Sequence, residues 1–159
     1  GCDPMPLLRA ALSWNFVLAT AICASLLAQL IKVLLNLFIF HRFIAERMWG
    51  AGGMPSSHSA TVCAMVVATG RYCGVNSPLF AIAAVLSIIV MYDAMGVRYE
   101  TGEQAKVLNR MFTEWMDQGF EQFQLPHGKK LKEMVGHTPI EVVTGAALGI
   151  VLGFAMPMV

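Results

Sequence analysis

Four long apolar runs constrain the fold of this chain more than any other feature of its sequence. They cover roughly residues 14–40, 55–72, 78–96 and 139–159. A helix needs about 20 apolar residues to cross the hydrocarbon core of a bilayer, and each run is long enough for that. Hydrophobic residues make up 57% of the 159 residues and charged residues only 13%, unlike the composition of a water-soluble domain. The sequence therefore predicts an all-α, polytopic membrane bundle of about four transmembrane helices, forming one domain over residues 1–159.

Polar and small residues within these runs indicate which helix faces are turned inward. Gln29, Lys32 and Asn36 are three or four residues apart, so they share one face of the first helix. Polar residues inside a membrane helix usually face the bundle interior or a site. In the last run, Gly145 and Gly149 are four residues apart, a spacing typical of closely packed membrane helices. We therefore expect a tightly packed bundle with a polar interior on the first helix.

Residues 99–135 interrupt the apolar pattern. Between residues 104 and 123, apolar side chains recur at helical spacing with charged side chains between them. This pattern predicts an amphipathic helix lying in the membrane interface, and packing of the same helix on the bundle or on a partner subunit fits it about equally well. A basic segment at residues 128–132 then leads to the last run.

Three residues with reactive or charged side chains fall on one side of the predicted bundle. His58 lies at the start of the second run, Arg98 follows the third, and His137 precedes the fourth. Because successive spans alternate in direction, all three positions reach the same face. The segments on this face also carry most of the lysines and arginines, which by the positive-inside bias places it toward the cytoplasm or its organellar equivalent.

The two histidines are suited to nucleophilic catalysis. A histidine can attack a tetrahedral phosphorus atom and form a covalent phosphohistidine, which water resolves in a second step. We expect His137 to be the nucleophile, and Glu141, four residues later on the same helix face, to orient its ring and stabilise its charge. His58 would protonate the leaving oxygen, since the pKa of histidine lies near neutrality.

The other predicted site residues would bind the phosphate group. Arg98 offers a bidentate fork, and Lys32 or Arg42 offers a further positive charge. The Ser56 and Ser57 hydroxyls lie at the start of a helix, where backbone N–H groups also favour an anion. This chemistry requires neither a metal ion nor a cofactor.

Each histidine also has a purely structural interpretation. The serines around His58 are favoured at a helix start, and so is the Thr138-Pro139 pair that follows His137. Considered singly, each segment is most simply explained as a helix start. Two histidines and an arginine on one face make a shared site the better interpretation.

Several of these segments resemble the type 2 phosphatidic acid phosphatases and their relatives, the vanadium-dependent haloperoxidases. The Pro-Ser-Gly-His motif of that superfamily resembles residues 55–58, and its final His-x-x-x-Asp motif resembles residues 137–141. A divergent branch of small bacterial and plastid-type membrane proteins is more similar still. Its patterns match residues 52–60, 93–98 and 136–142.

This resemblance implies a helical membrane fold and assigns further residues to the superfamily's motifs. Arg98 would be the arginine of the third motif and Lys32 the lysine of the first. The Arg-Pro pair of the first motif has no counterpart at the expected place, and Arg42 lies further on. Residues 99–135 would be an insertion that separates Arg98 from His137.

Two classes of function remain open. The first is an integral membrane phosphatase that hydrolyses a lipid phosphate or pyrophosphate. The second is a catalytically silent structural or accessory subunit of a larger membrane complex, such as one in a plastid or thylakoid membrane. For both classes we expect membrane lipids and a homo-oligomer or larger complex as partners, and a location in a bacterial inner membrane or a plastid membrane. The formal net charge of +1 gives no reason to expect nucleic acid as a partner.

Overall fold

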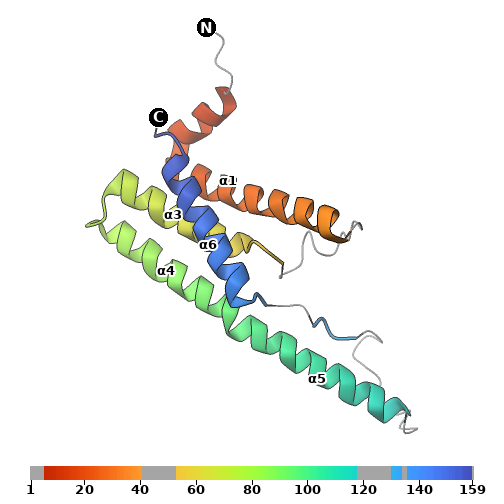
Figure 1. Ribbon diagram of the computed structural model, residues 1–159. Coiled ribbons are helices and arrows are strands. Elements are labelled where there is room, and N and C mark those ends of the chain that lie inside the picture. The colour runs from red at the N-terminus through yellow and green to blue at the C-terminus, as the bar shows by residue number, and fades with distance from the viewer. Residues whose placement is uncertain (1–5, 41–52, 118–129, 134–135, 159) are drawn as a thin grey trace.

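The computed structural model describes residues 6–40, 53–117, 130–133 and 136–158. Within these ranges the regular secondary structure is helical, and the prediction of an all-α bundle is confirmed (Figure 1). The helices are α1 (Pro6–Phe40), α3 (Ser57–Cys73), α4 (Pro78–Met95), α5 (Val97–Asp117) and α6 (Pro139–Ala155).

Helix α1 is broken near its beginning, at Asn15. This residue has extended backbone angles, with φ −157° and ψ 95°. Its side-chain Oδ1 accepts the Leu18 N–H at 2.9 Å, as an N-cap asparagine does at a helix start. The apolar part of α1 therefore begins as a new helix after Asn15, close to the expected start at residue 14.

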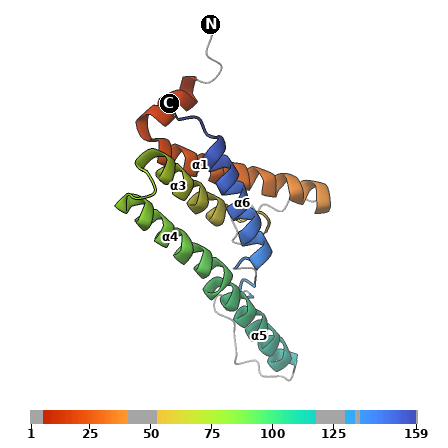
Figure 2. The same cartoon turned by 60° about the vertical axis from the view of Figure 1, so that its left-hand side comes forward.

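Helix α3 lies at the centre of the bundle and contacts α1, α4 and α6 (Figure 2). Its inward positions are small: Ala60, Ala64 and Ala68 are fully buried. Small side chains let backbones approach closely, which is how membrane helices gain packing energy. A central position, shielded from lipid on several sides, also fits the less apolar composition of α3 compared with its neighbours.

The glycines of α6 pack directly against the α3 backbone. A Cβ atom added to Gly145 would lie 2.3 Å from the Ser56 carbonyl oxygen, and one added to Gly149 would lie 2.3 Å from the Ala60 carbonyl oxygen. A Cβ at Gly153 would lie 2.7 Å from the Cβ of Val67. The predicted small-residue contact is therefore confirmed, and its partner is α3.

The outer surface of the bundle is apolar. Within the described ranges, two helical stretches are long and apolar enough to cross a membrane, Ser13–Phe38 and Pro78–Trp115, while Pro139–Ala155 is apolar but shorter. Large apolar side chains on the outside of α4 are exposed, among them Leu79, Ile82, Val85, Ile88 and Ile89. Such a surface fits hydrocarbon rather than water.

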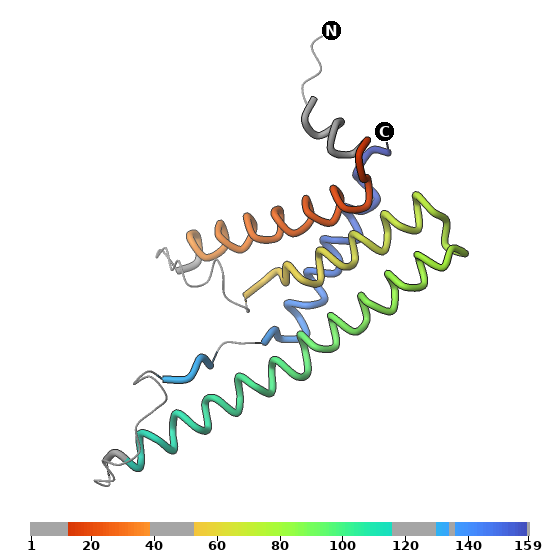
Figure 3. Tube along the Cα trace, turned by 180° about the vertical axis from the view of Figure 1, so that it is seen from behind, coloured from red at the N-terminus to blue at the C-terminus, as the bar shows by residue number. Residues whose placement is uncertain are grey.

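Helix α5 continues from α4 after Gly96 and extends beyond the rest of the bundle (Figures 1 and 3). It begins at Val97, earlier than the predicted amphipathic helix, and residues 118–123 of that prediction lie outside the described residues. Buried Asn109 donates from Nδ2 to the Leu131 carbonyl (2.9 Å) and to Glu133 Oε1 (2.8 Å), and its Oδ1 accepts the Leu131 N–H (2.8 Å). These hydrogen bonds hold the chain that returns toward α6 against α5. The interfacial location of α5 stays a prediction.

Candidate functional site

The site lies where three helix ends meet beside α1. These are the C-terminal end of α4 and the N-terminal ends of α3 and α6, which the alternating helix directions bring together beside the C-terminal half of α1 (Figure 1). Two backbone hydrogen bonds join the ends directly. The His137 N–H donates to the Ala94 carbonyl at 3.1 Å, and the Ser56 N–H donates to the Glu141 carbonyl at 2.9 Å.

The N-terminus of α3 is built from buried serines. Ser56 is the N-cap, and its Oγ accepts the N–H of Ser59 at 3.4 Å and the Ser59 hydroxyl at 3.1 Å. Ser57 is 6% exposed and begins the helix. The preceding loop turns at Gly53, whose φ of +90° suits glycine, beside the carbon stem of Lys32. This helix end therefore gathers N–H groups and hydroxyls next to a lysine.

His137 is the most deeply buried reactive group of the site. It is 1% exposed, and neither ring nitrogen has a hydrogen-bond partner among the described residues. Burial lowers its pKa to about 4, and the nearby charges of Lys32, His58 and Arg98 act in the same direction. At neutral pH the ring is therefore uncharged and keeps a lone pair available for attack.

His58 stands beside His137 and is exposed. The two rings are edge to face, with centroids 5.9 Å apart and an interplanar angle of 81°. The exposed ring can exchange protons with water while the buried ring cannot do so as readily. The two histidines thus differ in exposure, while the charges of Lys32 and Arg98 act on both of them.

Glycine packing brings His137 to Arg98, although the two are far apart in sequence. A Cβ atom on Gly136 would lie 2.3 Å from both the N and the Cα of Tyr99, so the chain can pass α5 this closely only with glycine there. The segment between Arg98 and His137 therefore leaves and returns at the same point. Gly136 had no predicted role, and its place just before the histidine was the available signal.

Arg98 is held at the end of α4 by a carboxylate. Its Nε donates to Asp93 Oδ2 at 2.6 Å, and the two side chains are 46% and 38% exposed. Its charge acts on both histidines. The guanidinium therefore stands at the open side of the site, fixed by Asp93.

Lys32 and Glu141 line the buried side of the site. Lys32 is 2% exposed and interacts electrostatically with Glu141 and His137. Glu141 Oε2 accepts the Thr138 N–H at 3.0 Å and completes a capping box at the start of α6. This carboxylate therefore fixes the residue next to His137, and among the described residues it makes no hydrogen bond to the His137 ring.

Arg42 lies outside the described residues, so its predicted contact with phosphate has no structural description. Within the described part of the chain, His, Cys, Asp and Glu side chains form no group of three or more that could hold a metal ion. The expectation of a metal-free and cofactor-free reaction stays a prediction.

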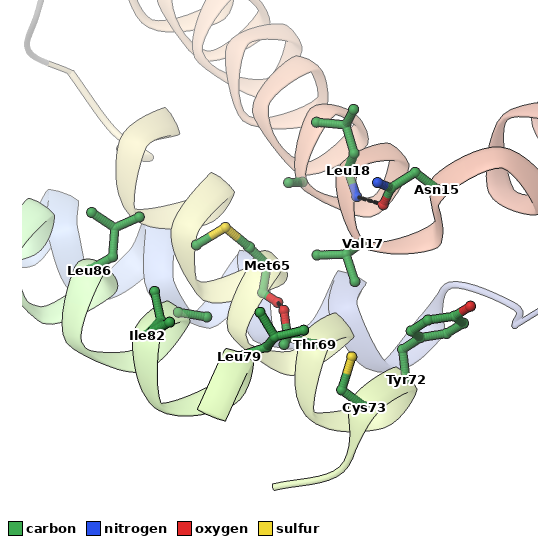
Figure 4. A pocket seen from close by; sticks show the side chains of 12 residues that line it. Asn15, Val17, Leu18, Met65, Thr69, Tyr72, Cys73, Leu79, Ile82 and Leu86 are labelled. Carbon is green, nitrogen blue, oxygen red and sulfur yellow. Dashed lines mark hydrogen bonds between the residues drawn. The ribbon is translucent and has the colours of Figure 1, made fainter. Parts of the chain in front are cut away.

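An open cavity of about 450 Å³ lies at the opposite end of the bundle, between α1, α3 and α4 (Figure 4). Its lining is mostly apolar and includes Val17, Leu18, Met65, Leu79 and Ile82. None of the predicted site residues lines it. The reactive side chains and this cavity are therefore separate features.

Comparison with known proteins gives two matches that cover most of the chain. The sequence matches the family described as "Divergent PAP2 family" over residues 13–152. A relative in Bacillus subtilis (strain 168), named "Uncharacterized membrane protein YuiD", is 39% identical over 144 residues, which are 87% of this chain and 91% of the relative. No solved structure shows significant similarity. The family match includes every described residue of the predicted site, from Lys32 to Glu141.

Proposed function

Because this chain belongs to the divergent PAP2 family of membrane proteins, we propose that it is a membrane phosphatase acting on a lipid phosphate or pyrophosphate through a phosphohistidine. The observation that carries the proposal is the state of His137. A buried, uncharged imidazole with two unpartnered nitrogens lies beside a second histidine and two cations. A purely structural histidine at this depth would normally have hydrogen-bond partners.

In the first step, an unprotonated nitrogen of His137 attacks the phosphorus atom. A nitrogen–phosphorus bond forms and the phosphorus–oxygen bond to the leaving group breaks, while protonated His58 donates its proton to the leaving oxygen. In the second step, His58 accepts a proton from water as the water oxygen attacks phosphorus. The nitrogen–phosphorus bond breaks, phosphate is released, and His137 returns to its uncharged form.

The phosphoryl oxygens would be held from both sides of the site. Lys32 contributes a buried charge and Arg98 an exposed one. The Ser56 and Ser57 hydroxyls and the first N–H groups of α3 supply hydrogen bonds, and Arg42 would add a third cation. Glu141 would stabilise the charge that His137 acquires on phosphorylation.

The proposed setting is a multi-pass protein of a bacterial inner membrane or a plastid membrane, with the site on the cytoplasmic or stromal face. The apolar exterior of α1 and α4 supports the membrane setting. The lysines and arginines of the segments that the sequence pattern assigns to this side support the orientation. In this setting the exposed His58 and Arg98 stand at the membrane surface, where the headgroup of a lipid phosphate lies.

A second candidate function is that of a structural or accessory subunit of a larger membrane complex. One observation favours it: α5 extends away from the bundle with Val107, Leu108 and Met111 exposed. An apolar helix face of this kind suits a partner as well as a membrane surface.

The test is phosphate release by the purified protein in detergent, with EDTA present, from a panel of lipid phosphates and pyrophosphates. We expect release that vanadate inhibits and that His137→Ala abolishes. Thr20→Val is the matched control, because Thr20 is a buried polar residue of α1 whose hydroxyl, among the described residues, bonds within its own helix, to the Phe16 carbonyl at 2.7 Å. Absence of release from every substrate, or release unchanged by His137→Ala, favours the accessory subunit.

A further inference from the structure

Gln29 lies at the inner edge of the site, one turn before Lys32 on α1. Its Nε2 donates to Ser57 Oγ at 3.4 Å. Its Oε1 is buried and has no hydrogen-bond partner among the described residues. One end of this amide is thus tied to the start of α3, and the other end is an unused acceptor.

The hydrogen bond from Gln29 determines what the Ser57 hydroxyl can do. A serine hydroxyl has one proton to donate and two lone pairs. At Ser57 a lone pair receives Gln29, and at neighbouring Ser56 the lone pairs receive the N–H and the hydroxyl of Ser59. Among the described residues, no acceptor receives the hydroxyl proton of either serine. Two adjacent buried hydroxyls are therefore left as donors, which suits an anion.

The two serine hydroxyls need an acceptor, whereas the Oε1 of Gln29 needs a donor. A buried carbonyl oxygen without a partner costs free energy, so the fitting ligand brings a donor to it. A phosphate group can carry a P–OH proton at neutral pH, because its relevant pKa is near 6 to 7. Sulfate has the same tetrahedral shape but no proton at this pH. A phosphodiester likewise has none.

We propose that Gln29 is a specificity-determining residue of the phosphate site. It orients the Ser57 hydroxyl as a donor to one phosphoryl oxygen and accepts the proton of a second, protonated phosphoryl oxygen at Oε1. The site thereby selects a terminal phosphate group that carries a proton over sulfate-like and diester groups. This inference rests on the proposed function for the position of the phosphate, and it names the chemical form that the site takes.

The experiment measures binding and needs no turnover. The purified full-length protein in detergent is unfolded thermally with increasing inorganic phosphate or sulfate at equal ionic strength, and the stabilisation gives an apparent Kd for each anion. We expect the wild type to bind phosphate about tenfold more tightly than sulfate, because a site with a buried acceptor disfavours the analogue that lacks the donor. Gln29→Leu should bring the two affinities within about twofold of each other, whereas Thr20→Val should keep the wild-type preference.

A double-mutant cycle tests whether Gln29 acts through Ser57. If it does, Gln29→Leu weakens phosphate binding less in a Ser57→Ala background than in the wild type, so the two effects are not additive. Gln29→Met, which keeps the length of the side chain, replaces Gln29→Leu if the latter fails to fold.

The outcomes separate this inference from the proposed function. Equal binding of phosphate and sulfate by the wild type, or an unchanged preference in Gln29→Leu or Gln29→Met, overturns the role of Gln29 even if the protein hydrolyses lipid phosphates. Absence of binding to both anions overturns it as well, and absence of hydrolysis in addition overturns the proposed function. Loss of the preference in a variant that still binds anions supports the inference even if no substrate of the panel is hydrolysed.

Discussion

The two ends of the bundle differ in whether their polar side chains have hydrogen-bond partners within the protein. At the end opposite the site, Arg71 Nη1 donates to the carbonyls of Gly153 and Met156, both at 2.7 Å, and the guanidinium lies 5.5 Å from the Phe16 ring centre. At the site end, His137 and Gln29 have buried atoms without partners among the described residues. Structural polar groups are normally satisfied within the protein. The contrast indicates that the polar groups of the site end are arranged for a ligand.

The largest expected effect is that of His137→Ala. If this end serves catalysis, phosphate release should fall by about 10³-fold or more, since a nucleophile has been removed. The ring makes no hydrogen bond to another described residue, so any fall in melting temperature should reflect only the cavity that the buried ring leaves. The measurement is steady-state phosphate release together with thermal unfolding in the same detergent. A large drop in melting temperature with retained activity would make His137 a structural residue. The two ends of the bundle would then not differ in the role of their polar side chains.

Gly149→Val tests the contact between α3 and α6 that holds both ends in place. The added side chain would meet the Ala60 backbone, and overpacking of this kind costs about 1–3 kcal/mol, occasionally more. We expect a lower unfolding midpoint in a mild-to-denaturing detergent titration. Val151→Ala, at an exposed position of the same helix, is the control that should leave the midpoint unchanged. Equal midpoints for the two variants would contradict the close packing.

Arg71→Ala should produce the reverse of the His137→Ala result. Loss of two charge-assisted hydrogen bonds to the last turn of α6 should cost about 1–3 kcal/mol of stability. Activity per folded molecule should persist, because Arg71 is at the far end from the site. Thermal unfolding and phosphate release measure the two effects, and Arg71→Lys should recover part of the stability. A variant that is stable but inactive would show that the ends are not independent.

The smallest effect concerns pH. The ordinary histidine pKa is 6.5, and burial lowers that of His137 to about 4. The unfolded chain therefore binds more protons at this residue between these values, so its contribution to stability falls as the pH decreases from 6.5 toward 4. Unfolding midpoints across this range should decline in the wild type and decline less in His137→Ala. An identical pH dependence for both proteins would contradict an uncharged, buried His137.

The sequence could predict that these helix ends meet, because their meeting depends on local signals. The serine N-cap at Ser56 and the Thr138-Pro139 helix start fix where two helices begin, and alternating spans bring those starts to one end. The small residues of α6 likewise predicted close helix packing, but they did not indicate which helix they pack against. These features follow from short-range patterns and from chain direction.

The remaining details depend on contacts between distant segments. Glu141 was expected to orient His137, but its Thr-Pro-Ile-Glu context is also a capping box, and in the structure its carboxylate bonds Thr138. The contact of Gly136 with Tyr99 and the hydrogen bonds of Asn109 to Leu131 arise only when the returning chain lies beside α5. No local pattern distinguishes such an asparagine from one in an exposed loop, and the place of Gly136 just before His137 was the one local signal for that glycine.

The most direct test of the central claim is the detection of a phosphoryl group on His137. His58→Ala is the variant to use, with p-nitrophenyl phosphate as substrate, because its leaving group departs without a proton and the first step can proceed while water activation is impaired. After rapid quenching at alkaline pH, peptide mass spectrometry should find a phosphoryl group on the peptide that contains residue 137, and His58→Ala/His137→Ala should lack it. Product formation without this adduct, or an adduct on another residue, would contradict the proposed role of His137.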